Sequence, residues 1–416
     1  IMKRRQFIQQ AGIFSASSLI TVGTNALVSR SIAANPNSKR LIVIFLRGAV
    51  DGLSVVVPYT ENAYYQARKR IAIPQPDKPG GVLDLDGKFG LHPSLAALMP
   101  LWKQKSLAFV HACGSPESTR SHFDAQEYME TGTPGIKNTK DGWMNRLLAK
   151  MTQENNPIQA VNVGSNIPRI LSGKKAIATI PAGRRVAKRL PIDNPQLTRA
   201  FDKLYSGNDA LSKAYRDARQ SREALMESDV EMQMANNGAP LPKGFSRDAQ
   251  RLARLMVRDS RIELAFLALG GWDTHINQGN TKGQLSQRLQ RLGDGLATLQ
   301  KELGEVYKYT NIIVLSEFGR TVKENGNGGT DHGHGNVMWL LGGNIRGGQI
   351  YGKFPGLSNN QLYQGRDLAI TTDFRDVIAT VLQNHMNLDK TKISQIFPNH
   401  NSVNSEQLTV TKQLSI

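Results

Sequence analysis

Short, continuous apolar runs recur along the chain, and most of them stop at a glycine, an acid or a histidine. Unbroken apolar runs of this length are typical of strands that are buried on both faces, as in a parallel sheet. The longest runs predict core strands at residues 41–46, 106–110, 262–269 and 312–316. Shorter strands are expected at residues 53–57, 158–163, 176–180 and 339–342.

Apolar residues at helical spacing separate these runs. The clearest series consists of leucines at positions 285, 289, 292, 296 and 299. Further helices are expected over residues 93–101, from Ser121 onward, and after Thr372 or Asp373, either of which could cap the helix. Strands that alternate with helices predict an α/β fold, with a doubly wound, mostly parallel sheet and helices on both faces.

The segment from about 190 to 260 breaks this alternation. It is highly charged, has few β-branched residues, and contains loop sequences at 236–240 and 242–244. We therefore expect a helical insertion, about 190–260, within a single domain that spans residues 35–416.

The N-terminus resembles a twin-arginine export signal. The pair Arg4 and Arg5 precedes a weakly apolar stretch at 11–28, and small residues at 31–33 offer a cleavage site. Residues 1–34 are therefore expected to be removed, which leaves a periplasmic or extracellular protein with no transmembrane anchor.

The charge of the chain favours anionic partners. The formal net charge is +18, of which four positive charges lie in residues 1–34, so the mature chain carries +14. Such a chain attracts anionic substrates or anionic envelope polymers. Nucleic acid is disfavoured as a partner, because the sequence has neither zinc-finger spacing nor a basic motif interleaved with aromatic residues. Cys113 is the one cysteine, which excludes a thiolate-rich metal site and leaves oxygen and nitrogen as metal ligands.

Acids and histidines follow several of the predicted strands. Since parallel sheets bind ligands at the carboxyl ends of their strands, these side chains are expected to meet at one edge. Carboxylates and imidazoles there suit a divalent metal such as zinc, manganese, calcium or magnesium. The candidate ligands are Asp51, Asp273, His275, Glu317, Asp331, His332 and His334.

The histidines at 332 and 334 alternate with glycines. Gly333 and Gly335 are expected to remove Cβ crowding and to permit unusual backbone angles, so that both histidines converge on a ligand. The alternative is that Asp331 and His332 only shape a turn through hydrogen bonds.

The candidate catalytic residues have structural alternatives. Ser121 could be a nucleophile or simply the N-cap of the helix that it precedes. His122 could contact the substrate or the metal, or could only pack. Arg47 and Arg320, each next to a strand-end acid, could clamp an anionic group or could pair with acids structurally.

Six motifs spread over nearly the whole chain carry a family resemblance. They are the twin-arginine start, Phe45–Gly48 with Asp51-Gly52, Arg120–Phe123, Gly271–His275, Ser316–Thr321 and Asp331–Gly335. Together they resemble the exported domain-of-unknown-function family 1501, which is similar to a remote branch of the alkaline phosphatase and sulfatase superfamily. The resemblance implies an alkaline phosphatase-like fold, with one or two divalent metals at the carboxyl end of the sheet. It also implies a Ser, Thr or formylglycine nucleophile near the start of a helix, here Ser121 or alternatively Ser118 or Thr119.

The chain departs from the superfamily pattern after the strand at 312–316. A Ser-Asp-His-Gly strand end is replaced by Ser-Glu-Phe-Gly, so that Phe318 stands where a histidine is expected. A second metal would then need His332 or His334 as a ligand. Cys113 is followed by a proline one position later than the sulfatase signature requires, and the signature arginine is absent, which disfavours a formylglycine sulfatase.

The sequence thus predicts an exported, metal-dependent hydrolase-like protein that acts on a phosphate, sulfate or similar anionic ester. The rival is a non-catalytic envelope or extracellular protein that retains the fold for binding or assembly. Phe318 in a ligand position favours the rival.

Overall fold

The computed structural model describes residues 38–151, 156, 158–164, 166–182, 195–216, 244–400 and 410–411. The predicted signal at 1–34 and most of the predicted loop sequence at 236–244 lie outside these residues.

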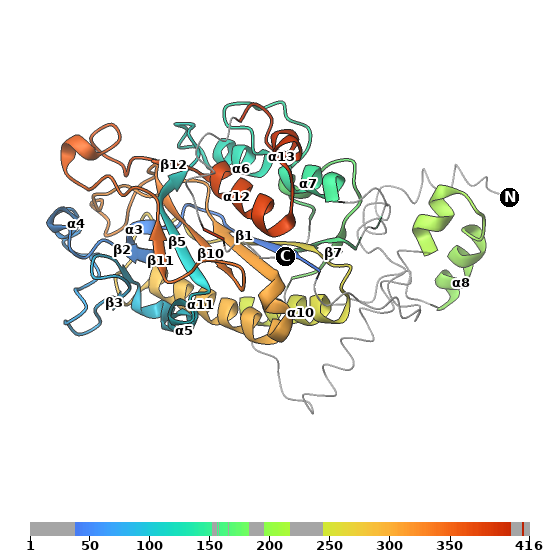
Figure 1. The fold of residues 1–416 in the computed structure, drawn as a ribbon, viewed down its shortest axis with the longest axis horizontal. Helices are drawn as coiled ribbons and strands as arrows, with labels where there is room; N and C mark the ends of the chain where they lie inside the picture. The colour runs from blue at the N-terminus through green and yellow to red at the C-terminus, as the bar shows by residue number, and fades with distance from the viewer. Residues whose placement is uncertain are drawn as a thin grey trace.

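A nine-stranded sheet forms the centre of the structure (Figure 1). Its order is β11-β5-β10-β9-β1-β8-β6-β7, with β12 beside β5. All strands run in one direction except β10, which is antiparallel to both of its neighbours. This confirms the predicted, largely parallel α/β sheet. The strands are β1 (Arg40–Leu46), β5 (Leu107–Gly114), β6 (Ala160–Val163), β7 (Ala178–Ile180), β8 (Leu264–Leu269), β9 (Thr310–Leu315), β10 (Asn336–Gly342), β11 (Gln349–Tyr351) and β12 (Thr372–Asp373).

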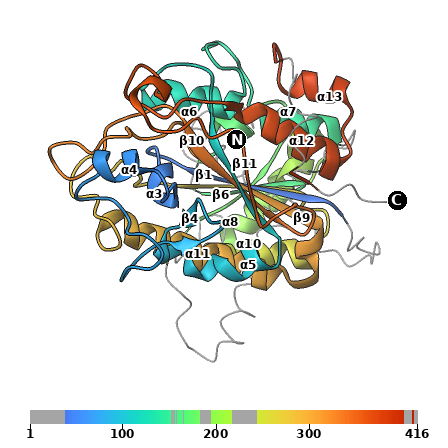
Figure 2. The ribbon, with the colours of Figure 1, turned by 60° about the vertical axis from the view of Figure 1, so that its left-hand side comes forward.

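Helices cover both faces of this sheet, as Figures 1 and 2 show. Because successive side chains of a strand point to opposite faces, Val43 of β1 packs in one hydrophobic cluster and Ile44 in the other. The cluster around Ile44 includes η1 (Pro93–Leu98), α5 (Met99–Lys103), α10 (Phe245–Arg258) and α11 (Gln284–Leu303). The cluster around Val43 includes α7 (Trp143–Met151), α12 (Phe374–Met386) and α13 (Lys390–Ile396). A further helix, α6 (His122–Thr131), lies on the same side as α7.

A small antiparallel sheet lies beside the main one. It has the order β2-β4-β3, with β2 (Val56–Val57), β3 (Leu83–Asp84) and β4 (Gly90–Leu91). The predicted strand at 53–57 is wrong in its first half, because Gly52–Val55 forms the short helix α3. The cause is a hydrogen bond from the backbone N–H of Val55 to the carbonyl of Asp51, which curls the chain before it extends into β2. The helix α4 (Asn62–Ala67) follows.

The region expected to be a helical insertion contains helices outside the core and one helix that belongs to the core. α8 (Pro195–Leu204) lies at the right-hand edge of Figure 1, beyond the end of the sheet, and residues 210–216 are also helical. By contrast, α10 packs against α11 and belongs to the core. The remaining short 3-10 helices are η2 (Arg169–Leu171), η4 (Gly304–Tyr309) and η5 (Asn359–Gln361). None of the described helices is long and apolar enough to cross a membrane.

Candidate metal centre

The reversed direction of β10 explains how the site is assembled. Asp273 and His275 follow the carboxyl end of β8, Glu317 follows that of β9, and His122 begins α6 after β5. His332 precedes β10, and because β10 runs against its neighbours its amino end lies at the same edge. Arg320 and His332 form an isolated antiparallel bridge, which pairs the two ends of the loop between β9 and β10. Residues from four strand ends therefore meet at one edge of the sheet.

The imidazole rings of His122 and His275 both face the ring of His332 at this edge. The Nε2 atom of His332 lies 3.0 Å from Nε2 of His122 and 3.0 Å from Nε2 of His275. Asp273 completes the group: its Oδ1 is 3.0 Å from Nε2 of His275 and 3.4 Å from Nε2 of His332, and its Oδ2 is 3.6 Å from Nε2 of His122. The donor atoms of His122, Asp273 and His332 all lie within 4.8 Å of one another and could hold a metal ion.

The opposite nitrogen of each ring has its own oxygen partner. Nδ1 of His122 lies 2.7 Å from Oε1 of Glu317, and Nδ1 of His275 lies 3.0 Å from Oδ1 of Asp331. Nδ1 of His332 lies 2.9 Å from the backbone carbonyl of Arg120. A carbonyl or a carboxylate can only accept, so the neutral rings of His122 and His332 carry their proton on Nδ1 and present an Nε2 lone pair, whereas His275 has a carboxylate at each ring nitrogen.

The Nε2 atoms of His122 and His332 therefore cannot satisfy each other by a hydrogen bond while both rings are neutral. Two lone pairs and the Asp273 carboxylate at this spacing repel unless a cation or a proton compensates them. Fixing the outer ring nitrogen with a carboxylate or carbonyl is also how proteins orient metal-binding histidines. The chemistry of the donor set thus fits a divalent metal, held by nitrogen and oxygen and by no sulfur.

Glu317 is held by several hydrogen bonds and in turn orients His122. Its Oε1 accepts hydrogen bonds from the backbone N–H of Gly48 at 2.9 Å and from Gln126 at 2.8 Å, in addition to contacting His122. Burial raises the pKa of this carboxyl, but the hydrogen bonds from His122, Gln126 and Gly48 outweigh burial and hold the pKa below its usual value. Conversely, the hydrogen bond to Glu317 raises the pKa of His122 above its usual value, against the effect of partial burial. Glu317 is therefore a buried anion that orients His122.

Asp273 is held by Arg320. A guanidinium Nη1 lies 2.5 Å from Oδ1 of Asp273, while Nε of Arg320 donates to the Thr330 hydroxyl at 3.2 Å. Burial acts to raise the pKa of Asp273, but the Arg320 hydrogen bond and charge bring the pKa below its usual value. In His332, partial burial followed by the charges of His122 and Arg320 lowers the pKa, which favours the neutral ring.

Two other predicted ligands, Asp331 and His334, have different places: Asp331 contacts the histidine group and His334 does not. Asp331 supports His275, and its pKa is lowered first by a hydrogen bond from Asn325 and then by His275. His334 stacks on Tyr363, with ring centroids 4.2 Å apart, and burial lowers its pKa. The structure therefore separates His332 from His334, although they are two residues apart.

Asp51 already has a cation. Both of its oxygens contact the guanidinium of Arg68, at 2.5 and 3.0 Å, and Oδ2 also accepts from Ser54 and Gln278 at 2.7 Å each. Burial raises the pKa of Asp51, but Arg68 outweighs this and holds the pKa below its usual value. The Asp51 and Arg68 side chains are almost fully buried. Their pairing leaves Asp51 outside the group of three histidines.

The remaining predicted residues also occupy definite places. Ser121 is the N-cap of α6, and its hydroxyl accepts from the backbone N–H of Asp124 at 3.4 Å while remaining exposed. Phe318 is buried and stacks on the His122 ring, with centroids 4.9 Å apart. Arg47 pairs with Glu130 at 2.5 Å.

Gly333 and Gly335 matter because other backbone atoms lie close to them, and not because they adopt unusual backbone angles. A Cβ on Gly333 would meet the carbonyl carbon of Arg320 at 2.4 Å, and one on Gly335 would meet the Leu368 carbonyl oxygen at 2.7 Å. Neither glycine has a positive φ. The expectation of reduced crowding is therefore confirmed, and the expectation of unusual backbone angles is wrong, because close backbone approach is the constraint at both positions.

Several residues that complete the site were not predicted as site residues. Gln126 lies one helical turn after His122, a spacing that places both on one face of α6. Arg68 and Gln278 carry no comparable sign, because each reaches Asp51 from a distant loop.

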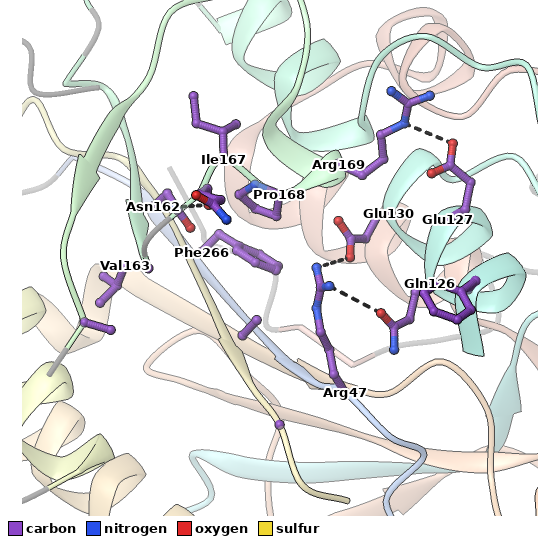
Figure 3. Close-up of a pocket in the computed structure, with 16 residues that line it drawn as sticks. Arg47, Gln126, Glu127, Glu130, Asn162, Val163, Ile167, Pro168, Arg169 and Phe266 are labelled. Atoms are coloured by element: carbon purple, nitrogen blue, oxygen red, sulfur yellow. Dashed lines mark hydrogen bonds and ion pairs between the residues drawn. The ribbon is translucent and has the colours of Figure 1, made fainter. Parts of the chain in front are cut away.

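A pocket of about 650 Å³ lies next to the histidine group, on the side of β8 and β6 (Figure 3). Gln126 belongs to both, because it lines the pocket and donates to Glu317. Arg47 lines the same wall and donates to Oε1 of Gln126 at 3.3 Å. The pocket and the histidine group therefore share one wall.

Comparison with known proteins gives a family and distant structural neighbours. Residues 38–397 match the family described as protein of unknown function (DUF1501). None of the curated proteins matches the sequence.

The solved structures that resemble the chain are similar at low identity. Ps i-CgsB, crystallised with k-i-k-neocarrahexaose, has 11% identity and a TM-score of 0.38, with 86% of this chain and 74% of that chain covered. The lipoteichoic acid synthase LtaP from Listeria monocytogenes has 10% identity and a TM-score of 0.34, with coverage of 90% and 78%. A protein in the alkaline phosphatase superfamily from Vibrio parahaemolyticus has 11% identity and a TM-score of 0.36, with coverage of 85% and 72%.

Proposed function

Since the chain belongs to the DUF1501 family of proteins of unknown function, we propose a function from the geometry of its site. The protein is a metal-dependent hydrolase that acts on a phosphate, sulfate or similar anionic ester. The single observation that carries this proposal is that the Nε2 atoms of His122 and His332 and a carboxylate oxygen of Asp273 lie within 4.8 Å of one another.

The donor set favours zinc among the divalent metals. The ligands would be His122, Asp273 and His332, with His275 beside them. Calcium and magnesium prefer oxygen ligands, whereas two imidazoles and one carboxylate are typical of zinc and similar transition metals. A bound divalent ion would supply a Lewis acid that lowers the pKa of a hydroxyl or water and offsets the charge of an anionic ester.

The protein side chains would control protons and orientation. Glu317 keeps the His122 proton on Nδ1, so that Nε2 remains available, and the Arg120 carbonyl does the same for His332. Ser121, next to His122 at the exposed start of α6, is the proposed nucleophile, with Ser118 and Thr119 as alternatives. Arg320 and Arg47 are engaged by Asp273 and Glu130, so we propose positioning roles for them.

A pair of matched histidine variants tests the metal centre. Metal content would be measured by mass spectrometry after reconstitution with zinc, and hydrolysis would be followed with aryl phosphate and aryl sulfate substrates. His332→Ala should lose the metal and the hydrolysis, whereas His334→Ala, two residues away and stacked on Tyr363, should retain both. Equal metal content in wild type and His332→Ala would refute the proposed centre.

A second function remains supported by two observations. Phe318 stands where the resembled superfamily has a histidine, and the candidate ligand Asp51 is paired with Arg68, so a second metal would lack ligands there. A protein of this kind could use its fold only to bind an envelope partner. Stoichiometric zinc without turnover of any phosphate or sulfate ester, in protein that binds anionic envelope polymers, would favour this alternative.

Export through the twin-arginine pathway belongs to the same proposal. The support is the arginine pair at the start of the chain and the net charge of the remainder, which suits anionic envelope polymers. Replacing Arg4 and Arg5 by lysine should leave full-length precursor in the cytoplasm. Normal export of that variant would reject the pathway.

A further inference from the structure

The pocket beside the histidine group is built on one face of α6. Phe123, Gln126, Glu127 and Glu130 line it, and their spacing of three, four and seven residues from Phe123 places them on one helical face. The helix begins with His122 in the metal group. A ligand with one end at that group could therefore extend along α6 into the pocket.

The pocket carries balanced charge. Arg47 pairs with Glu130 at 2.5 Å, and Arg169 pairs with Glu127 at 3.0 Å, as the dashed lines in Figure 3 show. These two pairs account for all four charged residues that line it within the described part of the chain. This part of the lining is thus locally neutral, although the chain as a whole is strongly basic. A neutral pocket suits an uncharged portion of a ligand, because a further anion would compete with Glu127 and Glu130 for the same guanidinium groups.

The lining combines planar polar groups with apolar surface. Asn162 donates through Nδ2 to the carbonyl of Asn166 at 2.9 Å, which leaves its acceptor oxygen for a ligand hydroxyl. Pro168 and Ile167 provide apolar surface near Asn162 (Figure 3). Phe123 presents an aromatic ring at the rim that is 90% exposed. A volume of about 650 Å³ lies in the range of pockets that enclose ligands of several rings.

We infer that this pocket binds the uncharged, hydroxyl-bearing part of the substrate, a carbohydrate, while the anionic ester lies at the histidine group. A sugar ring offers an apolar C–H face for Phe123 and hydroxyls for the amides and the charge-paired guanidinium groups. The assignment of the ester to the histidine group rests on the proposed hydrolase function. The binding of a neutral sugar does not, so the two can fail separately.

The test measures sugar binding to the full chain in the absence of metal. A panel of neutral di- and trisaccharides of hexose, pentose and N-acetylhexosamine units would be examined by saturation-transfer NMR, and binders titrated by calorimetry. At least one neutral oligosaccharide should bind. Phe123→Ala should weaken its binding at least tenfold, and Ala268→Phe, which places a ring in the pocket from an exposed position at the end of β8, should abolish it.

Two controls separate this result from other causes. Val257→Ala removes an exposed apolar side chain from α10, on the other face of the sheet, and should leave binding unchanged. His332→Ala should also leave neutral-sugar binding unchanged, even where it abolishes metal binding. The inference is overturned if no member of the panel binds, if binding is the same in Phe123→Ala and Ala268→Phe as in wild type, or if benzyl alcohol binds where the sugars do not.

Discussion

Two aspartates at the same edge of the sheet have opposite surroundings. Asp51 is 1% exposed in its side chain and has a built-in cation, Arg68. Asp273 is 43% exposed, and besides Arg320 it faces the Nε2 atoms of three imidazole rings. Each aspartate has an arginine partner, but the first pair is buried, whereas the second borders partly exposed histidines that could share a metal ion with it. An acid at a strand end thus becomes structural or functional according to what surrounds it besides its arginine.

The largest expected effect concerns the buried pair of Asp51 and Arg68. Arg68→Met should lower the free energy of unfolding by about 3–5 kcal/mol, because Asp51 would remain buried without a cation. Arg70→Ala is the matched control, since its pair with Glu324 is exposed and should contribute at most about 1 kcal/mol. Urea unfolding of both variants measures the difference. A small effect of Arg68→Met would mean that Asp51 takes up a proton or gains water, and the two aspartates would then be less different than the structure indicates.

Three buried histidines should make the stability of the folded protein sensitive to acid. Burial lowers the pKa of His92, His111 and His385 to about 4. Each is then neutral in the folded state near pH 5.5, while the unfolded chain binds a proton below about pH 6.5. The unfolded state binds more protons, so stability falls as the pH falls from 6.5 toward 4, by about 1 kcal/mol per histidine over the first pH unit.

The opposite sign is expected for one site histidine. The pKa of His122 is raised, so its contribution to stability is present at low pH and is lost as the pH rises through its folded value. One such group against three buried histidines leaves a net loss of stability toward acid. Urea unfolding of metal-free protein between pH 6.5 and 5.5 measures this loss. Constant stability over that interval would show that the buried histidines are not neutral in the fold.

A bound metal ion should stabilise the folded protein through the histidine group and not through Asp51. Zinc at 100 times its dissociation constant should raise the free energy of unfolding of the wild type by about 2.7 kcal/mol. His332→Ala should lose this increment, yet its metal-free form should be as stable as the wild type or more so, because the close contact between the Nε2 atoms of His332 and His122 is removed. Calorimetric unfolding with and without zinc measures both quantities. A metal-free His332→Ala protein that is strongly destabilised would indicate that the ring only holds the loop together.

Glu317→Gln should have a smaller effect. The amide keeps the size of the side chain but weakens the control of the His122 ring, so zinc affinity should fall about 10–100-fold. Competition with a chromophoric chelator measures the affinity. Glu324→Gln, an acid outside the group, is the control and should bind zinc as the wild type does.

The smallest effect separates two roles of Ser121. As the N-cap of α6, its loss in Ser121→Ala should cost about 1 kcal/mol of stability. A nucleophile would in addition lose nearly all turnover, whereas Ser121→Thr should retain the cap. Steady-state rates beside unfolding curves distinguish the cases, and full activity in Ser121→Ala would leave the cap as its only role.

The sequence predicted the sheet better than the site. Continuous apolar runs such as residues 41–46 and 312–316 are local properties, and strands formed at these places because burial on both faces requires them. The convergence of His122 with His332 depends instead on the reversed direction of β10, which no local pattern encodes. The pairing of Asp51 with Arg68 was also beyond prediction, since it joins a strand end to a residue after α4 through tertiary packing alone.

The antiparallel course of β10 has a consequence for how such a protein could change over time. The peptide between Leu315 and Asn336 leaves the sheet and returns to it at the same edge, and it carries Glu317, Arg320, Asp331 and His332. A single contiguous stretch of genetic material therefore encodes much of the chemistry while the strands on either side stay as they are. Homologous recombination across that stretch could exchange one reactive group for another in a single event. The same boundaries offer a natural place to graft a different site onto this scaffold in the laboratory.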